Sequence, residues 1–180
     1  MSRLPPVDAD VLTIQQKKMY DEILRVRGQV RGPFAILLNS PELGQMALAM
    51  QDWFQKKSML PARLVELAIL TMARKANAQF AWSVHEKRGR NNGLSDDVIE
   101  ALRQRRSPVF ARDDERLTYD LACELFETRT LSPASYARGA AHFGIQGLVE
   151  LVSLVGFYVM VAMLLNSFEA DPPQGLMLLE

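Results

Sequence analysis

The stretch NAQFAWSVHEKRG, residues 77–89, contains His85, one of only two histidines in the chain. An imidazole gains and loses a proton near neutral pH, so a histidine is well suited to general acid or general base catalysis. Glu66 lies nineteen positions earlier, within an otherwise apolar run. A carboxylate among apolar residues is costly to bury unless it is paired or protonated, so Glu66 requires a partner.

Both residues lie in segments that are typical of helices. One helix is expected to begin at Pro61, where apolar residues recur at helical spacing, and the next to run through His85 to Asn91-Asn92-Gly93. If a short turn at residues 76–78 joins them as an antiparallel pair, Glu66 and His85 stand about ten and eight residues from that turn. The sequence therefore predicts that these two side chains face each other and line one pocket, with an arginine close by.

Helix start and stop signals cover the rest of the chain, and no strand-like alternation stands out. The other expected helices are a capped helix from Thr13 to Gly28, a short turn before Ser40, a helix from Pro41 to about Lys56, helices at 96 to about 105 and 112–129, a start at Ser132-Pro133, and an apolar helix at 148–165. We predict an all-α bundle of about eight helices. It forms a single domain, 1–180, with a helical extension at 1–30 and a polar tail at 169–180.

Composition narrows the classes of function. The chain carries 21 basic and 21 acidic residues, so we expect no binding to nucleic acid or to an anionic membrane. A single cysteine, Cys123, excludes a disulfide within one chain, and the N-terminal residues contain no apolar targeting segment, so a cytoplasmic location is expected. The run 148–165 is long enough to span a membrane, but Glu150 and the lack of basic flanks favour a buried helix or an oligomer interface.

The sequence motifs resemble those of a known superfamily, that of carboxymuconolactone decarboxylase and alkylhydroperoxidase D (AhpD). The resemblance covers most of the chain and rests on three segments: GPFAILLNSPELG (32–44), LPARLVELAILTMARKANAQFAWSVHEKRGRNNGLSDDVIEAL (60–102) and LVELVSLVGFYVMVAMLLNSF (148–168). It implies an AhpD-like helical bundle. It also implies a homo-oligomer, which would be a dimer, a trimer or a hexamer.

The two branches of the superfamily imply different chemistry. The peroxidase branch has a Glu, a Cys-x-x-Cys pair and a His, which correspond here to Glu66, Ala78, Ala81 and His85. Peroxide reduction by this route needs one thiol to attack and a second to resolve, and the chain has neither at these positions. The decarboxylase branch lacks the cysteine pair and keeps the glutamate, a tryptophan-to-histidine segment and the turn NNGL (91–94).

The resemblance favours a carboxymuconolactone decarboxylase-like enzyme that acts without a metal or cofactor on a small lactone or organic acid of aromatic catabolism. Glu66 and His85 are the expected catalytic residues, and Arg74, Trp82 and Arg88 the expected substrate-binding residues. Two alternatives stay open: an alkylhydroperoxidase or peroxiredoxin-type antioxidant enzyme, and a non-catalytic scaffold or ligand-binding protein.

Each candidate residue also has a purely structural interpretation. His85 fits a core histidine, Glu66 a buried structural acid, Trp82 a packing residue, Arg74 an ion-pair partner and Arg88 part of a solvated basic run. His142 is expected to be a partly exposed structural residue. Cys123 is expected to behave as a small apolar side chain.

Overall fold

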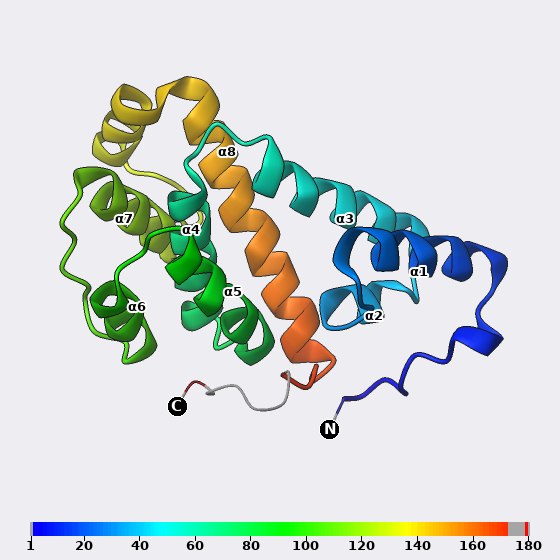
Figure 1. The fold of residues 1–180 in the computed structure, drawn as a ribbon. Helices are drawn as coiled ribbons and strands as arrows, with labels where there is room; N and C mark the ends of the chain where they lie inside the picture. The colour runs from blue at the N-terminus through cyan, green and yellow to red at the C-terminus, as the bar shows by residue number, and fades with distance from the viewer. Residues whose placement is uncertain (1, 173–178, 180) are drawn as a thin grey trace.

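The computed structural model describes residues 2–172 and residue 179, and within these residues the chain is helical with no strand (Figure 1). The elements are η1 (Ala9–Val11), α1 (Ile14–Arg27), α2 (Pro33–Leu37), α3 (Pro41–Lys56), α4 (Ala62–Lys75), α5 (Gln79–Asn91), α6 (Asp96–Arg103), α7 (Asp113–Thr128) and α8 (Pro133–Ser167). The predicted all-α class and the helix number are confirmed.

Local signals explain where most helices begin and end. Thr13 and Gln16 form the expected capping box of α1, which ends at Gly28 in the left-handed conformation, φ 73°. The side chain of Ser95 accepts the backbone N–H of Val98 at the start of α6. Ser40 precedes α3 as predicted, but its side chain makes no capping hydrogen bond. The start of α3 therefore depends on Pro41, whose φ is already helical.

The helix α8 runs between two groups of helices, α1–α3 on one side and α4–α7 on the other (Figure 1). Helix α4 packs against α5, α7 and α8 and is buried continuously from Leu64 to Arg74. Helix α1 packs against α3, and its residues Met19 and Ile23 are fully buried. The predicted N-terminal extension, 1–30, therefore contributes a helix to the hydrophobic core.

Two segments that were expected to be separate helices are joined in α8. The chain continues from Pro133 to Ser167 through a kink at Gly144, which has φ 68° and ψ 171°. The apolar part of this helix is long and apolar enough to cross a membrane, but 56% of its most apolar window is buried inside the structure. That degree of burial fits the core helix of a soluble protein.

Glu150 lies on α8 and has the partners that a buried acid needs. Its carboxylate accepts hydrogen bonds from the Ser58 hydroxyl at 2.7 Å, the Met59 backbone N–H at 2.9 Å and the Gln146 amide at 2.9 Å. Burial alone would raise the pKa of Glu150, but these hydrogen bonds hold it below the ordinary value. Glu150 therefore fixes the loop before α4. His142, on the same helix, was expected to be partly exposed and is exposed.

The N-terminal segment contacts the C-terminal end of α8. The backbone N–H of Arg3 donates to the carbonyl of Phe168 at 3.0 Å, and the Arg3 side chain pairs with Glu169 at 2.8 Å. Of the predicted polar tail, 169–180, residues 173–178 and 180 lie outside the described residues. Leu179 is bound through its backbone to the side chain of Gln79 at the start of α5.

Two apolar stripes remain uncovered in the single chain. They comprise Leu43, Met46, Met50 and Trp53 on α3 and Ile145, Val149, Val152 and Met163 on α8, with exposures from 37% to 69%. A monomeric protein seldom exposes so many large apolar side chains at helical spacing, so these stripes suit an interface between copies of the chain.

We expect light scattering on the purified protein to give a multiple of the 20.3 kDa chain mass. The double substitution Ile145→Asp/Val149→Asp should reduce that mass, because it places two charges on the exposed stripe of α8. The matched double substitution Gln15→Asp/Lys18→Asp, at exposed positions of α1, should leave the mass unchanged. A monomer at micromolar concentration would contradict the prediction.

Candidate functional site

Glu66 and His85 meet across the hairpin of α4 and α5. His85 Nδ1 lies 2.7 Å from Glu66 Oε2, and each side chain is only about 5% exposed. The turn that joins the helices spans residues 76–78, as expected, and Asn77 in it has a left-handed φ of 51°. The predicted juxtaposition of the two residues is confirmed. With the Nδ1 hydrogen donated to the carboxylate, Nε2 is the ring nitrogen left for other chemistry.

Tyr158 of α8 approaches that second ring nitrogen. Its hydroxyl lies 3.5 Å from His85 Nε2, the two rings meet edge to face, and the Gln51 amide donates to the same hydroxyl at 3.3 Å. Burial raises the pKa of Tyr158, and the charge of Glu66 raises it further. The phenol therefore stays protonated at neutral pH and can donate a hydrogen bond.

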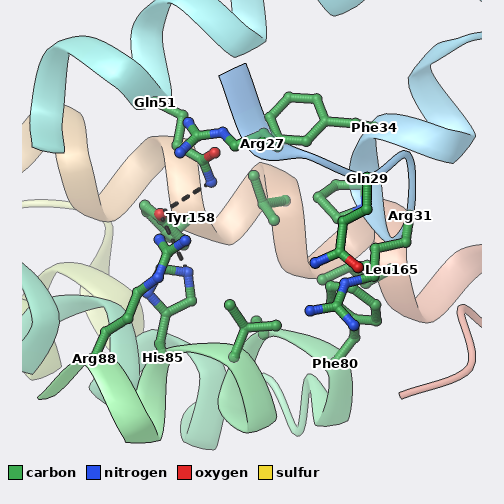
Figure 2. A pocket seen from close by; sticks show the side chains of 14 residues that line it. Arg27, Gln29, Arg31, Phe34, Gln51, Phe80, His85, Arg88, Tyr158 and Leu165 are labelled. Atoms are coloured by element: carbon green, nitrogen blue, oxygen red, sulfur yellow. Dashed lines mark hydrogen bonds between the residues drawn. The ribbon is translucent and has the colours of Figure 1, made fainter. Parts of the chain in front are cut away.

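His85 and Tyr158 open on a cavity of about 100 Å³ between the two groups of helices (Figure 2). The cavity is smaller than a typical pocket for a drug-sized molecule, so it suits a small ligand. Its other lining residues come from α1, the α1–α2 connection, α2, α3, α5 and α8: Arg27, Gln29, Arg31, Pro33, Phe34, Gln51, Phe80, Ala81, Val84, Arg88, Val161 and Leu165. No carboxylate is among them.

Glu66 does not line this cavity, so the prediction that both residues line one pocket is corrected. It lies behind the His85 ring and borders a second, polar pocket together with Ser58, Asn92 and Arg88. Arg88 borders both pockets and is the arginine expected close to the pair. Glu66 can therefore act on a ligand in the cavity only through the imidazole.

The structure does not bring Arg74 and Trp82 to the cavity. Arg74 lies eight positions beyond Glu66 on α4, about 12 Å along the helix axis, and borders a pocket beside α6 and α7. Trp82 is fully buried; its indole N–H donates to Glu86 at 3.0 Å, and the Arg103 guanidinium lies 5.2 Å from the ring. Of the three predicted substrate-binding residues, Arg88 alone lines this cavity, and the binding roles of Arg74 and Trp82 stay predictions without a contact to it.

Ala78 and Ala81 stand where the peroxidase branch of the superfamily has its two cysteines. Ala81 lines the cavity one helical turn before His85, and Ala78 is buried just before α5. Cys123 lies on α7, where its thiol interacts with Lys75 and Tyr119, and it does not line the cavity. Burial raises the pKa of the Cys123 thiol, which makes it less reactive.

The sequence analysis missed Gln51, Tyr158, Arg27 and Arg31. They come from α1, the α1–α2 connection, α3 and α8, and no motif connects them with His85 in the sequence. One signal in the sequence could have pointed to Gln51 and Tyr158. Both are polar residues among the buried apolar residues of a helix, where a polar group needs a partner or a function. Within the described residues, no group of three or more His, Cys, Asp or Glu side chains could hold a metal ion.

Comparison with known proteins defines the class. The model of the carboxymuconolactone decarboxylase family matches residues 42–113. The Escherichia coli K12 protein YnjA, described as uncharacterized, is 30% identical over 182 residues, covering 96% of this chain and 94% of that protein. The chain therefore belongs to the carboxymuconolactone decarboxylase family.

Solved structures share the fold at low sequence identity. The AhpD-core, peroxidase-related protein of Ralstonia eutropha JMP134 superposes with a TM-score of 0.78 at 16% identity, covering 96% of this chain and 93% of that chain. A peroxidase-related protein of Silicibacter sp. TM1040 gives 0.76 at 18% identity, with 96% and 92% covered. These similarities establish the AhpD-like helical fold.

Gly32 holds the α1–α2 connection against the cavity wall, and this contact can be tested. It has φ 58°, and a Cβ at this position would lie 2.3 Å from the Phe80 ring. Gly28 also has a left-handed φ, but a Cβ there would meet no atom within 4 Å. Gly28→Ala should lower the free energy of unfolding by about 1 kcal/mol. Gly32→Ala should cost roughly 1–3 kcal/mol more, because the ring must move and because the Gly32 backbone, with ψ −133°, lies outside the left-handed helical region of Gly28.

Denaturant unfolding of the two variants measures this difference. Equal losses of stability would show that Phe80 yields freely, and the packing role of Gly32 would then be wrong.

Proposed function

We propose that this protein is a cofactor-free acid–base enzyme of the carboxymuconolactone decarboxylase type, acting on a small lactone or organic acid of aromatic catabolism. One observation carries the proposal: His85 is held by Glu66 through Nδ1, while Nε2 is beside a cavity that also contains Tyr158 and Arg88. A carboxylate that holds one nitrogen of an imidazole, with the other ring nitrogen beside a pocket, is the arrangement of a general acid or base. The expected homo-oligomeric state and cytoplasmic location stay predictions.

Decarboxylation at this site needs a proton and an electron sink. The bond between the substrate carbon and its carboxylate breaks, CO₂ leaves, and the electron pair delocalises into a conjugated carbonyl of the substrate. The protonated His85 then donates its Nε2 hydrogen to that carbon, and the neutral ring regains a proton from water. Glu66 stabilises the imidazolium, and the Tyr158 hydroxyl can donate a hydrogen bond to the enolate oxygen while keeping its proton.

The thiol peroxidase alternative has less support in this chain, although solved relatives bear the name peroxidase-related. That chemistry requires a thiolate beside the histidine and a second thiol to resolve the sulfenic acid. Ala78 and Ala81 supply neither, and Cys123 is the only cysteine. An activity assay distinguishes a non-catalytic scaffold from the enzyme, because a scaffold would release no CO₂ whether or not the Glu66–His85 pair is intact.

Substitution of the pair tests the proposal. His85→Gln and Glu66→Gln should each lower kcat for CO₂ release from carboxylated lactones by about 100-fold or more, because each removes the proton-transfer unit. The double variant should lose little beyond either single one, as expected for residues that act together. Circular dichroism and light scattering check that helix content and assembly are retained. Well-folded single variants with full activity would reduce His85 to a core residue.

Cys123→Ser tests the peroxidase alternative. Because the thiol lies outside the cavity, CO₂ release should be unchanged, and the melting temperature should fall only slightly from lost packing. Peroxide consumption is measured in parallel with an added dithiol as reductant. Peroxide turnover that is present in the natural protein and lost in Cys123→Ser would overturn our assignment.

A further inference from the structure

The charge around the cavity is uneven. Three arginines line it, Arg27 and Arg31 from one group of helices and their connection and Arg88 from the other, and none of the fourteen lining residues is acidic. Cations that gather around a pocket without acids repel one another unless an anion joins them.

Two of the three guanidinium groups have no carboxylate partner among residues 2–172 and 179. Arg88 makes no ion pair there, and Arg31 lies over the Phe80 ring at 5.9 Å. Arg27 is paired with Asp52 at 3.0 Å, but Asp52 is shared with Lys56 at 2.5 Å. The neighbourhood of the cavity therefore keeps an excess of positive charge.

Arg27 and Arg88 approach the same end of the cavity. Figure 2 shows Arg88 beside the Tyr158 hydroxyl and His85, with Arg27 next to Gln51 on the other side of that hydroxyl. Burial lowers the pKa of Arg27, and the nearby charge of Arg88 also acts to lower it. The Arg27 Nε hydrogen is buried without a hydrogen-bond partner. A buried donor without an acceptor is uncommon in proteins, and here it borders a cavity.

We propose that Arg27 and Arg88 form an anion clamp, in which the two guanidinium groups hold the carboxylate of a small organic acid beside Tyr158 and His85 Nε2. Guanidinium groups bind carboxylates through charge-assisted hydrogen bonds. The apolar body of the acid packs against Val84, Val161 and Leu165, which also line the cavity. The clamp rests on the proposed function in one respect, since the bound acid would be the substrate of the enzyme. Binding of the acid itself does not require turnover.

The clamp has a mechanical consequence, because its halves belong to different parts of the fold. Arg27 ends α1 and Arg88 lies on α5; both residues line the cavity, and the two helices belong to the groups on either side of α8 (Figure 1). A carboxylate bound between the two guanidinium groups attracts both of them, whereas without it the two positive charges repel each other. Binding should therefore tie the two groups of helices together and raise the melting temperature.

Crotonate and crotonamide are suitable probes, since they have nearly the same size and shape and differ in charge. Calorimetric titration in a carboxylate-free buffer of low ionic strength should show binding of crotonate at least about tenfold tighter than that of crotonamide. Crotonate should also raise the melting temperature of the natural protein. Equal affinity for the two probes would overturn the clamp.

Substitutions locate the binding site. Arg27→Gln and Arg88→Gln should each weaken crotonate binding about tenfold or more and abolish the rise in melting temperature. Asp52 keeps Lys56 as a partner when Arg27 is replaced, so its charge is not left unpaired. The control Arg25→Gln removes an exposed arginine of the same helix, 71% exposed and paired with Glu22, and should leave binding unchanged.

The outcomes separate this inference from the proposed function. Arginine-dependent crotonate binding without CO₂ release from any acid tested would support the clamp and contradict the decarboxylase. Decarboxylation that proceeds with unchanged KM in Arg27→Gln and Arg88→Gln would overturn the clamp alone. If Arg27→Gln does not fold, Arg27→Lys takes its place, because it keeps the charge and should retain part of the affinity for crotonate. Complete loss of crotonate binding in a folded Arg27→Lys variant, together with intact binding in Arg88→Gln, would contradict the clamp.

Discussion

A carboxylate inside an apolar helix must find a partner, and the arrangement of the site follows from that requirement. Glu66 lies in the most continuously buried helix of the protein, where an unpaired charge would be strongly destabilising. Its partner is the imidazole of His85, which the antiparallel hairpin brings to 2.7 Å. The bond fixes the ring, and the fixed ring presents Nε2 to the cavity. One buried pairing thus serves both stability and the orientation of a reactive atom.

The hairpin supplies only one wall of the cavity. Helix α8 adds Tyr158 from its apolar middle, and α1 to α3 with their connections add the opposite wall with two of the three arginines. Helix α8 contacts both groups of helices, so its position sets the width of the space between them. The Glu66–His85 pair therefore forms within one hairpin, while the other residues that line the cavity reach it only through the packing of distant segments.

This division explains what could be read from the sequence. Helix boundaries followed from local capping and turn residues such as Thr13, Gly28 and Ser95. The Glu66–His85 pair could be predicted because both residues belong to one hairpin with a short turn. Arg27 and Tyr158 could not, since their proximity to His85 depends on tertiary packing over long sequence separations. The distance of Arg74 from the cavity has a related cause: it lies eight positions beyond Glu66 on α4, and it borders a pocket beside α6 and α7.

Ala81 has an implication for the environments in which the pocket can work. Its methyl group occupies the wall position one turn before His85, and none of the fourteen side chains around the cavity contains sulfur. Sulfur atoms are the groups in proteins that peroxides oxidise most readily. An oxidant that enters the pocket therefore meets no thiol or thioether among these fourteen side chains, whereas a site built on two thiols would be converted to a disulfide.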